Sequence, residues 1–335
     1  MLRCLDCGGE LRSLDEGTGE PGLACDDCGR RYEVIAGVVD LRPPVEGYDV
    51  AADRALALEL AGTGAGASFE ALLRRYWAAQ ADVDPALAEG FVVGDLIGAD
   101  RAAAVLGQIE QLLGPGSLDV DVAVEIGCGT AALGSVLASS VRHVIVTDIS
   151  LSWLVLARRR LDEAGIANVT VVAATGDHLP LAPGAVDLVV GADVIEHVPD
   201  PTAVVRSCAQ VLKPGAALWL STPNRYSLTP EPHVHLWGVG WLPRPLALRY
   251  VRRCRGTDYG DVHTLSARGL RVLLEGAGGT VTVTAPEIAP AQRARYGTVG
   301  RALSGAYHVA RRLPGVSALL RWVGPLLHGV GRAPA

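Results

Sequence analysis

The chain has 335 residues, of which 49% are hydrophobic and 20% are charged, and its formal net charge is −6. This composition is typical of a globular protein with a sizeable core and excludes a low-complexity or fibrous chain. The start of the sequence does not resemble a signal peptide and no run of about 18 apolar residues occurs, so we expect a cytoplasmic protein without a transmembrane segment.

Four cysteines lie in the first 28 residues as two C-x2-C pairs, Cys4 with Cys7 and Cys25 with Cys28. Two such pairs offer four thiolates, the ligand set of a tetrahedral structural Zn²⁺ site. A disulfide would need an oxidising compartment, and a redox site would use only one of the pairs. We therefore expect a zinc ribbon over residues 1–43. It resembles the ribbons of tRNA-methyltransferase activator subunits and of a bacterial rRNA guanine methyltransferase.

Residues 44–115 are interpreted as a helical linker or lid that leads into the main domain. Ala- and Leu-rich stretches with helical spacing cover residues 50–62, 68–81 and 99–113. The glycines of 62–66 separate the first two stretches. We expect some of these helices to cover the ligand cleft of the main domain.

From residue 120 onward, short apolar runs alternate with amphipathic helical stretches. This pattern predicts an α/β fold with a doubly wound, mostly parallel sheet over 116–335. We expect seven strands, at 120–126, 144–148, 169–173, 186–190, 217–221, 281–284 and 326–331, the last of them antiparallel. Helices are expected at 151–164 and 201–212, with Ser150 and Asp200 as their N-caps.

Residues suited to ligand binding follow these strands at their carboxyl ends, where parallel sheets bind ligands. The first strand leads into Glu125-Ile126-Gly127-Cys128-Gly129, whose glycines let the backbone approach a ligand closely. Asp148 ends the second strand, Asp177 and His178 follow the third, and Asp193 follows the fourth. The glycine loop also satisfies a relaxed dinucleotide fingerprint, which leaves a nicotinamide oxidoreductase open.

In their order and spacing these motifs resemble the class I S-adenosylmethionine-dependent methyltransferases, in their quinone-biosynthesis-like branch, over about 120–224. The resemblance implies S-adenosyl-L-methionine as cofactor. It places Asp148 at the ribose, Asp177 and His178 beside the adenine, and Asp193 near the methyl group. The implied cofactor site consists of Glu125, Gly127, Cys128, Gly129, Asp148, Ile149, Asp177, His178 and Asp193. One departure is Ala131, where the family usually has a third glycine.

In this family the segments after the fifth strand line the acceptor pocket, which here corresponds to insertions at about 225–262 and 288–325. His197 and His263 are the expected catalytic bases, because a neutral imidazole can accept a hydroxyl proton. Glu196, His233 and His235 are further candidates. The pair His233-x-His235 lacks an evident third ligand for a metal ion.

We expect a methyltransferase acting on a small-molecule, lipid-linked or sugar acceptor. Residues 241–335 contain fourteen Arg against four Asp or Glu. This basic region keeps an RNA methyltransferase open as the rival, and also a peripheral membrane contact. A non-catalytic cofactor-binding scaffold is the alternative from another class. The sequence indicates no oligomeric state.

Overall fold

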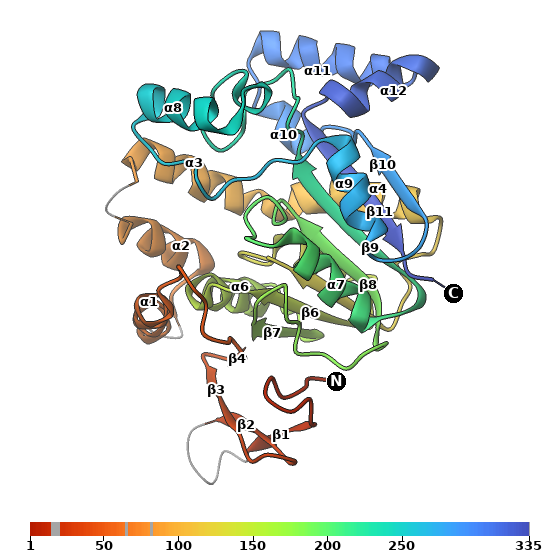
Figure 1. The fold of residues 1–335 in the computed structure, drawn as a ribbon. Helices are drawn as coiled ribbons and strands as arrows, with labels where there is room; N and C mark the ends of the chain where they lie inside the picture. Colours follow the sequence, from red (N-terminus) through yellow and green to blue (C-terminus); the bar gives the residue numbers. More distant parts are fainter. Residues whose placement is uncertain (15–20, 64–65, 81–82, 335) are drawn as a thin grey trace.

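A computed structural model describes residues 1–14, 21–63, 66–80 and 83–334, and its strands form one continuous sheet (Figure 1). The strand order across the sheet is β1-β2-β3-β4-β7-β6-β5-β8-β9-β11-β10. The bounds are β1 Leu11–Leu14, β2 Gly22–Cys25, β3 Arg31–Ile35, β4 Val38–Asp40, β5 Val122–Ile126, β6 His143–Asp148, β7 Val169–Ala173, β8 Val186–Ala192, β9 Leu212–Pro223, β10 Val281–Thr284 and β11 Leu326–Arg332.

The centre of the sheet is parallel, as the sequence predicts. Strands β4, β7, β6, β5, β8 and β9 pair in parallel, and β11 lies antiparallel between β9 and β10. The described sheet is larger and more mixed than the seven strands expected, with eleven strands. The reason is that β4 pairs with the outer strand β7, and so joins the cysteine-bearing strands to the main sheet through main-chain hydrogen bonds.

Helices cover both faces of the parallel strands (Figure 1). One face packs on α4 (Gly98–Leu113), α5 (Ala132–Leu137) and α6 (Leu151–Glu163), the other on α7 (Pro201–Val211) and α9 (Ala267–Glu275). Strand β5 shows why, because Ala123 belongs to the first core while Val122 and Val124 belong to the second. Successive side chains of a strand point to opposite faces, so two buried faces require a continuous apolar run.

The two predicted N-caps are confirmed. The Ser150 side chain accepts from the main-chain N–H of Trp153 at the start of α6, and Asp200 accepts from Thr202 and Ala203 at the start of α7. Each cap satisfies a helix N–H that has no partner within the helix, which is worth about 1 kcal/mol.

Within the described residues, four helices precede the main domain at 116–335: α1 (Val50–Gly62), α2 (Phe69–Ala78), α3 (Pro85–Leu96) and α4, which also packs on the sheet. The expected helix at 68–81 ends at Ala78, and α3 was not predicted, because its apolar residues follow no single helical face. Of the glycine-rich separator at 62–66, residues 64 and 65 lie outside the described residues.

The remaining helices gather at the upper end of Figure 1. They are the 3₁₀ helix η2 (Val239–Trp241), α8 (Arg244–Arg255), α10 (Pro290–Ala294), α11 (Thr298–Arg311) and α12 (Pro314–Val323). Within the described residues, no helix has the length and hydropathy needed to cross a membrane.

Candidate functional site

The glycine loop between β5 and α5 has a left-handed backbone at three residues, with φ of 60° at Gly127, 51° at Gly129 and 54° at Ala131. A Cβ on Gly127 would lie 2.2 Å from a methyl carbon of Val194, so only glycine fits there. A Cβ on Gly129 would meet no atom within 4 Å. The loop is therefore held against the end of β8 at Gly127 and faces open space at Gly129.

Asp148 fixes the conformation of this loop. One carboxylate oxygen accepts from the main-chain N–H of Gly129 at 2.9 Å, and the other accepts from the N–H of Ser150 at 2.9 Å. Burial raises the pKa of Asp148, and these hydrogen bonds oppose that rise. Each oxygen retains a second lone pair, so the carboxylate can accept further hydrogen bonds from a ligand.

Glu125 is buried beneath the loop and accepts from the N–H of Gly134 at 2.7 Å. Burial raises its pKa to about 8. Cys128 is also buried, its N–H donates to the Thr147 carbonyl at 3.0 Å, and burial raises the pKa of its thiol well above the usual value. The Glu125 carboxylate therefore holds the first turn of α5, and the Cys128 side chain packs in the core on one face of the sheet.

The other predicted cofactor residues lie at the same edge of the sheet. Asp177 and His178 are exposed after β7. Asp193 is exposed after β8, with φ of 53°, and accepts from the Ser221 hydroxyl at 3.0 Å. The Ile149 carbonyl accepts from Arg42 at 3.0 Å.

Two supports of this edge were not predicted from the sequence. The Thr130 hydroxyl in the glycine loop donates to Asp95 of α3 at 2.8 Å and accepts from Arg160 of α6 at 2.9 Å. On the other side, Arg42 is paired with Asp53 of α1 at 2.6 Å. No local pattern marks these residues, because their partners lie far away in the sequence.

Next to Asp193, the structure brings His197 and His233 together. Their Nε2 atoms are 3.1 Å apart, and Nδ1 of His233 lies 2.5 Å from the buried carboxylate of Glu231. Burial lowers the pKa of His233, but the hydrogen bond and charge of Glu231 raise it by more. Burial lowers the pKa of His197, and the neighbouring His233 lowers it further.

Of the two expected bases, only His197 belongs to this histidine pair. The backbone N–H of His263 donates to the Glu196 carbonyl at 2.7 Å, which places His263 beside the same segment, and its side chain is exposed. Pairing of His197 with His233 could not be found from the sequence, because it depends on how the loop after β9 folds back.

Within the part of the chain that the structure describes, two clusters have the spacing of metal ligands. In the first, single ligand atoms of Cys4, Cys7, Cys25 and Cys28 all lie within 4.8 Å of one another. The second consists of Glu196, His197 and His233 at the same spacing. Oε1 of Glu196 is buried and has no hydrogen-bond partner within the described residues, so it is oriented for a further contact.

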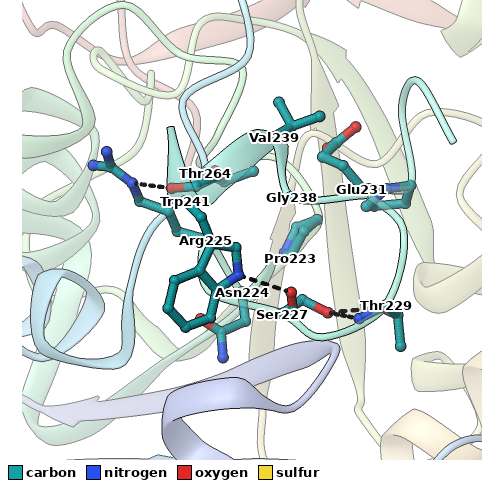
Figure 2. Close-up of a pocket in the computed structure, with 12 residues that line it drawn as sticks. Pro223, Asn224, Arg225, Ser227, Thr229, Glu231, Gly238, Val239, Trp241 and Thr264 are labelled. Atoms are coloured by element: carbon teal, nitrogen blue, oxygen red, sulfur yellow. Dashed lines mark hydrogen bonds between the residues drawn. The ribbon is translucent and has the colours of Figure 1, made fainter. Parts of the chain in front are cut away.

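A narrow recess of about 10 Å³, room for a single water, is lined by the residues drawn in Figure 2. Its walls come from the segment after β9, with Pro223, Asn224, Glu231, Val239, Trp241 and Thr264 among the lining residues. Glu231 belongs both to this recess and to the histidine pair.

Comparisons with known proteins find methyltransferases. A family model described as "Methyltransferase domain" matches residues 124–220. The ubiquinone biosynthesis O-methyltransferase of Cronobacter sakazakii is 30% identical over 192 residues, which cover 56% of this chain and 67% of the relative. The protein of the same name from Sodalis glossinidius is 31% identical over 193 residues, covering 57% and 68%. That of Xanthomonas euvesicatoria pv. vesicatoria is 37% identical over 102 residues, but these cover only 43% of the relative.

Solved structures are less similar. A protein from Thermotoga maritima, described as a SAM-dependent methyltransferase and possible histamine N-methyltransferase, superposes with a TM-score of 0.46 at 17% identity, covering 73% of this chain and 95% of that one. Phosphoethanolamine N-methyltransferase 2 of Haemonchus contortus gives 0.45 at 14% identity, covering 69% and 52%.

Proposed function

The chain belongs to the class I S-adenosylmethionine-dependent methyltransferases, and from this premise we propose that it methylates a hydroxyl oxygen of a small-molecule or lipid-linked acceptor. The observation that carries the choice of oxygen is the hydrogen-bonded series Glu231–His233–His197 beside Asp193. A hydroxyl must lose its proton as it attacks the methyl carbon, and such a series can take that proton. The relatives named as O-methyltransferases support the same choice.

The proton path follows from the geometry and the pKa directions. In the resting pair, His233 donates from Nδ1 to Glu231 and accepts at Nε2 from Nε2–H of His197. Nδ1 of His197 can then accept the hydroxyl proton. As it does so, the Nε2 proton of His197 passes to His233, whose pKa is raised by Glu231. The positive charge ends on His233 beside a buried carboxylate, where it is stabilised.

For the cofactor, we propose that the methyl donor lies across the loop at Gly129 and the end of β6. Asp148 would accept from the ribose hydroxyls, Asp177 and His178 would border the adenine, and Asp193 would lie near the sulfonium. The open space over Gly129 supports this placement, because a side chain there would occupy the volume that the ligand needs.

We also propose that one structural Zn²⁺ ion is held by Cys4, Cys7, Cys25 and Cys28. The zinc ribbon would cover residues 1–43, the helical linker or lid 44–115, and the methyltransferase domain 116–335. The clustering of the four thiols supports this. Four thiolates leave no open position for a reacting water, so the ion would stabilise the fold and not react. All seven cysteines are free thiols, which suits a cytosolic location.

A divalent cation is a second candidate for activating the hydroxyl. Glu196, His197 and His233 are also spaced to ligate one divalent cation, which would lower the pKa of a bound hydroxyl. Transfer that persists after complete chelation, with zinc still in the ribbon, favours the histidine path. Transfer that is lost on chelation and restored by Mg²⁺ favours the cation.

The test uses labelled S-adenosylmethionine and a cell extract separated into small molecules, lipids and RNA. We expect label in the small-molecule or lipid fraction, as an oxygen-linked methyl group. His197→Ala should bind the cofactor normally and lose about 10²–10⁴-fold in rate, the usual contribution of a general base. His263→Ala should lose less than about tenfold. Label in the RNA fraction would contradict the proposed acceptor class. An unchanged rate in His197→Ala would contradict the role of His197 as the base.

A further inference from the structure

Helix α11 exposes its apolar side to solvent, although surface helices ordinarily bury it. The residues Val299, Ala302, Leu303, Ala306 and Val309 recur every three or four positions and form one exposed stripe. The exposed fractions are 73% at Val299, 65% at Leu303 and 62% at Val309.

The polar side of α11 faces the protein instead. The Tyr307 hydroxyl donates to the Pro286 carbonyl at 2.8 Å, and Arg311 donates to the Ala285 carbonyl at 2.8 Å. Ser304, one turn earlier, is buried. These contacts fix the rotation of the helix, so the outward apolar stripe is a property of the folded chain.

The next helix continues the apolar surface. Leu313, just before α12, and Leu319 and Trp322 within it are each more than half exposed. Helices α11 and α12 pack against each other, and together they form the upper edge of the molecule in Figure 1. We call the segment 298–323 the apolar hairpin.

The charge around the apolar hairpin has a single sign. Residues 288–325 contain six Arg and no Asp or Glu. The nearest acid before them, Glu287, is paired with Arg311 at 2.8 Å. Exposed arginines such as Arg301 and Arg312 therefore border the apolar residues without a neighbouring acid in this segment.

We propose that the apolar hairpin docks on an anionic lipid surface. Aliphatic side chains and Trp322 would enter the boundary between headgroups and acyl chains, and the arginines would contact lipid phosphates. The positive charge of the hairpin favours an anionic lipid surface over the other possible partners. A second copy would bring the four arginines of one hairpin against the four of the other. An RNA would have to approach a face that offers aliphatic side chains in place of stacking surfaces.

The position of the hairpin gives this contact a use. The Leu228 N–H donates to the Val323 carbonyl at 3.0 Å, and the Asn224 side chain donates to the Arg321 carbonyl at 3.3 Å. Asn224 lines the recess of Figure 2. A lipid-linked acceptor held at this surface would therefore lie next to the segment after β9 that contains His233. This use depends on the proposed function, whereas the docking itself does not.

The test is flotation of the full-length protein with phosphatidylcholine vesicles, with and without phosphatidylglycerol. We expect flotation with the anionic vesicles, and weaker flotation with neutral vesicles or at high salt. Leu303→Gln and Leu319→Gln should each reduce partitioning by about tenfold. The matched control is Val272→Gln on α9, because Val272 is 59% exposed and Leu319 is 57% exposed. Arg301→Gln should weaken binding to anionic vesicles only, whereas Arg142→Gln, far from the hairpin in sequence, should change neither.

A second measurement uses the unaltered chain. Brominated lipid should quench part of the fluorescence of the six tryptophans, and this part should be lost in Trp322→Phe. The proposal is overturned if the protein does not float, if the hairpin variants float like Val272→Gln, or if those variants instead dissociate a dimer or release RNA. None of these readouts needs cofactor or acceptor, so they do not depend on whether the methylation proposal holds.

Discussion

The guanidinium of Arg42 donates to the main-chain carbonyl of Ile149 at 3.0 Å, although the two residues are 107 positions apart. The Arg42 side chain is almost fully buried, and it also pairs with Asp40 at 2.7 Å and Asp53 at 2.6 Å. Asp53 in turn accepts from the N–H groups of Leu151 and Ser152 at the start of α6. The end of the cysteine-bearing segment thus holds the turn that follows Asp148.

Replacing Arg42 with methionine should therefore destabilise the protein and weaken cofactor binding together. Asp53 would remain buried with its cationic partner removed, which typically costs about 3–5 kcal/mol. Denaturant unfolding measures the stability, and calorimetry measures the affinity for S-adenosylmethionine. Arg54→Met is the matched control, because Arg54 pairs with Glu33 on the surface and such a pair contributes less than about 1 kcal/mol. Equal effects of the two variants would contradict a structural role for the buried pair.

Alanine substitutions at Gly127 and Gly129 should have different effects, the first on folding and the second on cofactor binding. At Gly127 an added Cβ would collide with Val194, so Gly127→Ala should lower the stability markedly. At Gly129 the Cβ meets no protein atom, so Gly129→Ala should cost only the left-handed strain of about 1–2 kcal/mol. We expect Gly129→Ala to remain folded by circular dichroism and to bind S-adenosylmethionine at least about tenfold more weakly, a loss of about 1.4 kcal/mol. Unchanged binding in this variant would place the cofactor elsewhere.

The parts of the fold that were predictable are those with local signals. Strand β7 has the predicted bounds Val169–Ala173, because a short, mostly apolar run rich in β-branched residues marks a buried strand. Helix α8 was missed, because five of its twelve residues are Arg and it follows the Pro- and Trp-rich stretch that was interpreted as irregular. In the site, the glycine loop and Asp148 follow from spacing along the chain. The pairs Arg42–Asp53 and His197–His233 do not, because each forms only when distant segments pack together.

The ribbon should contain one zinc ion per chain. The motivation is the convergence of four thiols from two separate C-x2-C pairs. Cys25→Ser should lower the zinc content and the melting temperature together, since metal binding supplies the folding energy of so small a unit. Cys254→Ser is the control, because Cys254 is exposed on α8 and lies outside the cluster. The proposed zinc site would be wrong if metal analysis in reducing buffer gave well under one equivalent of zinc per chain, and if Cys25→Ser left the zinc content and the melting temperature unchanged.

The last prediction concerns the pH dependence of methyl transfer. The proposed path needs His233 uncharged at the start, because it must receive the proton that His197 passes on. Burial lowers the pKa of His233, but Glu231 raises it by more, so the net pKa lies above its ordinary value of about 6.5. We expect kcat to fall with acid below this raised pKa, and the rate to become independent of pH above it.

Changing Glu231 should move that profile in a known direction. In Glu231→Gln the raising contribution is lost, so the acid limb of kcat should shift to lower pH while the maximal rate falls, because the charge on His233 is no longer stabilised. Glu231→Gln should also lower the stability, and the loss should be largest at low pH. A raised folded pKa stabilises the protein below the unfolded pKa of about 6.5, and this contribution disappears as the pH rises through the folded value. Glu275→Gln makes the same charge change on the exposed end of α9 and should leave the profile unchanged. If Glu231→Gln and Glu275→Gln give the same acid limb, the Glu231–His233 pair does not receive the proton.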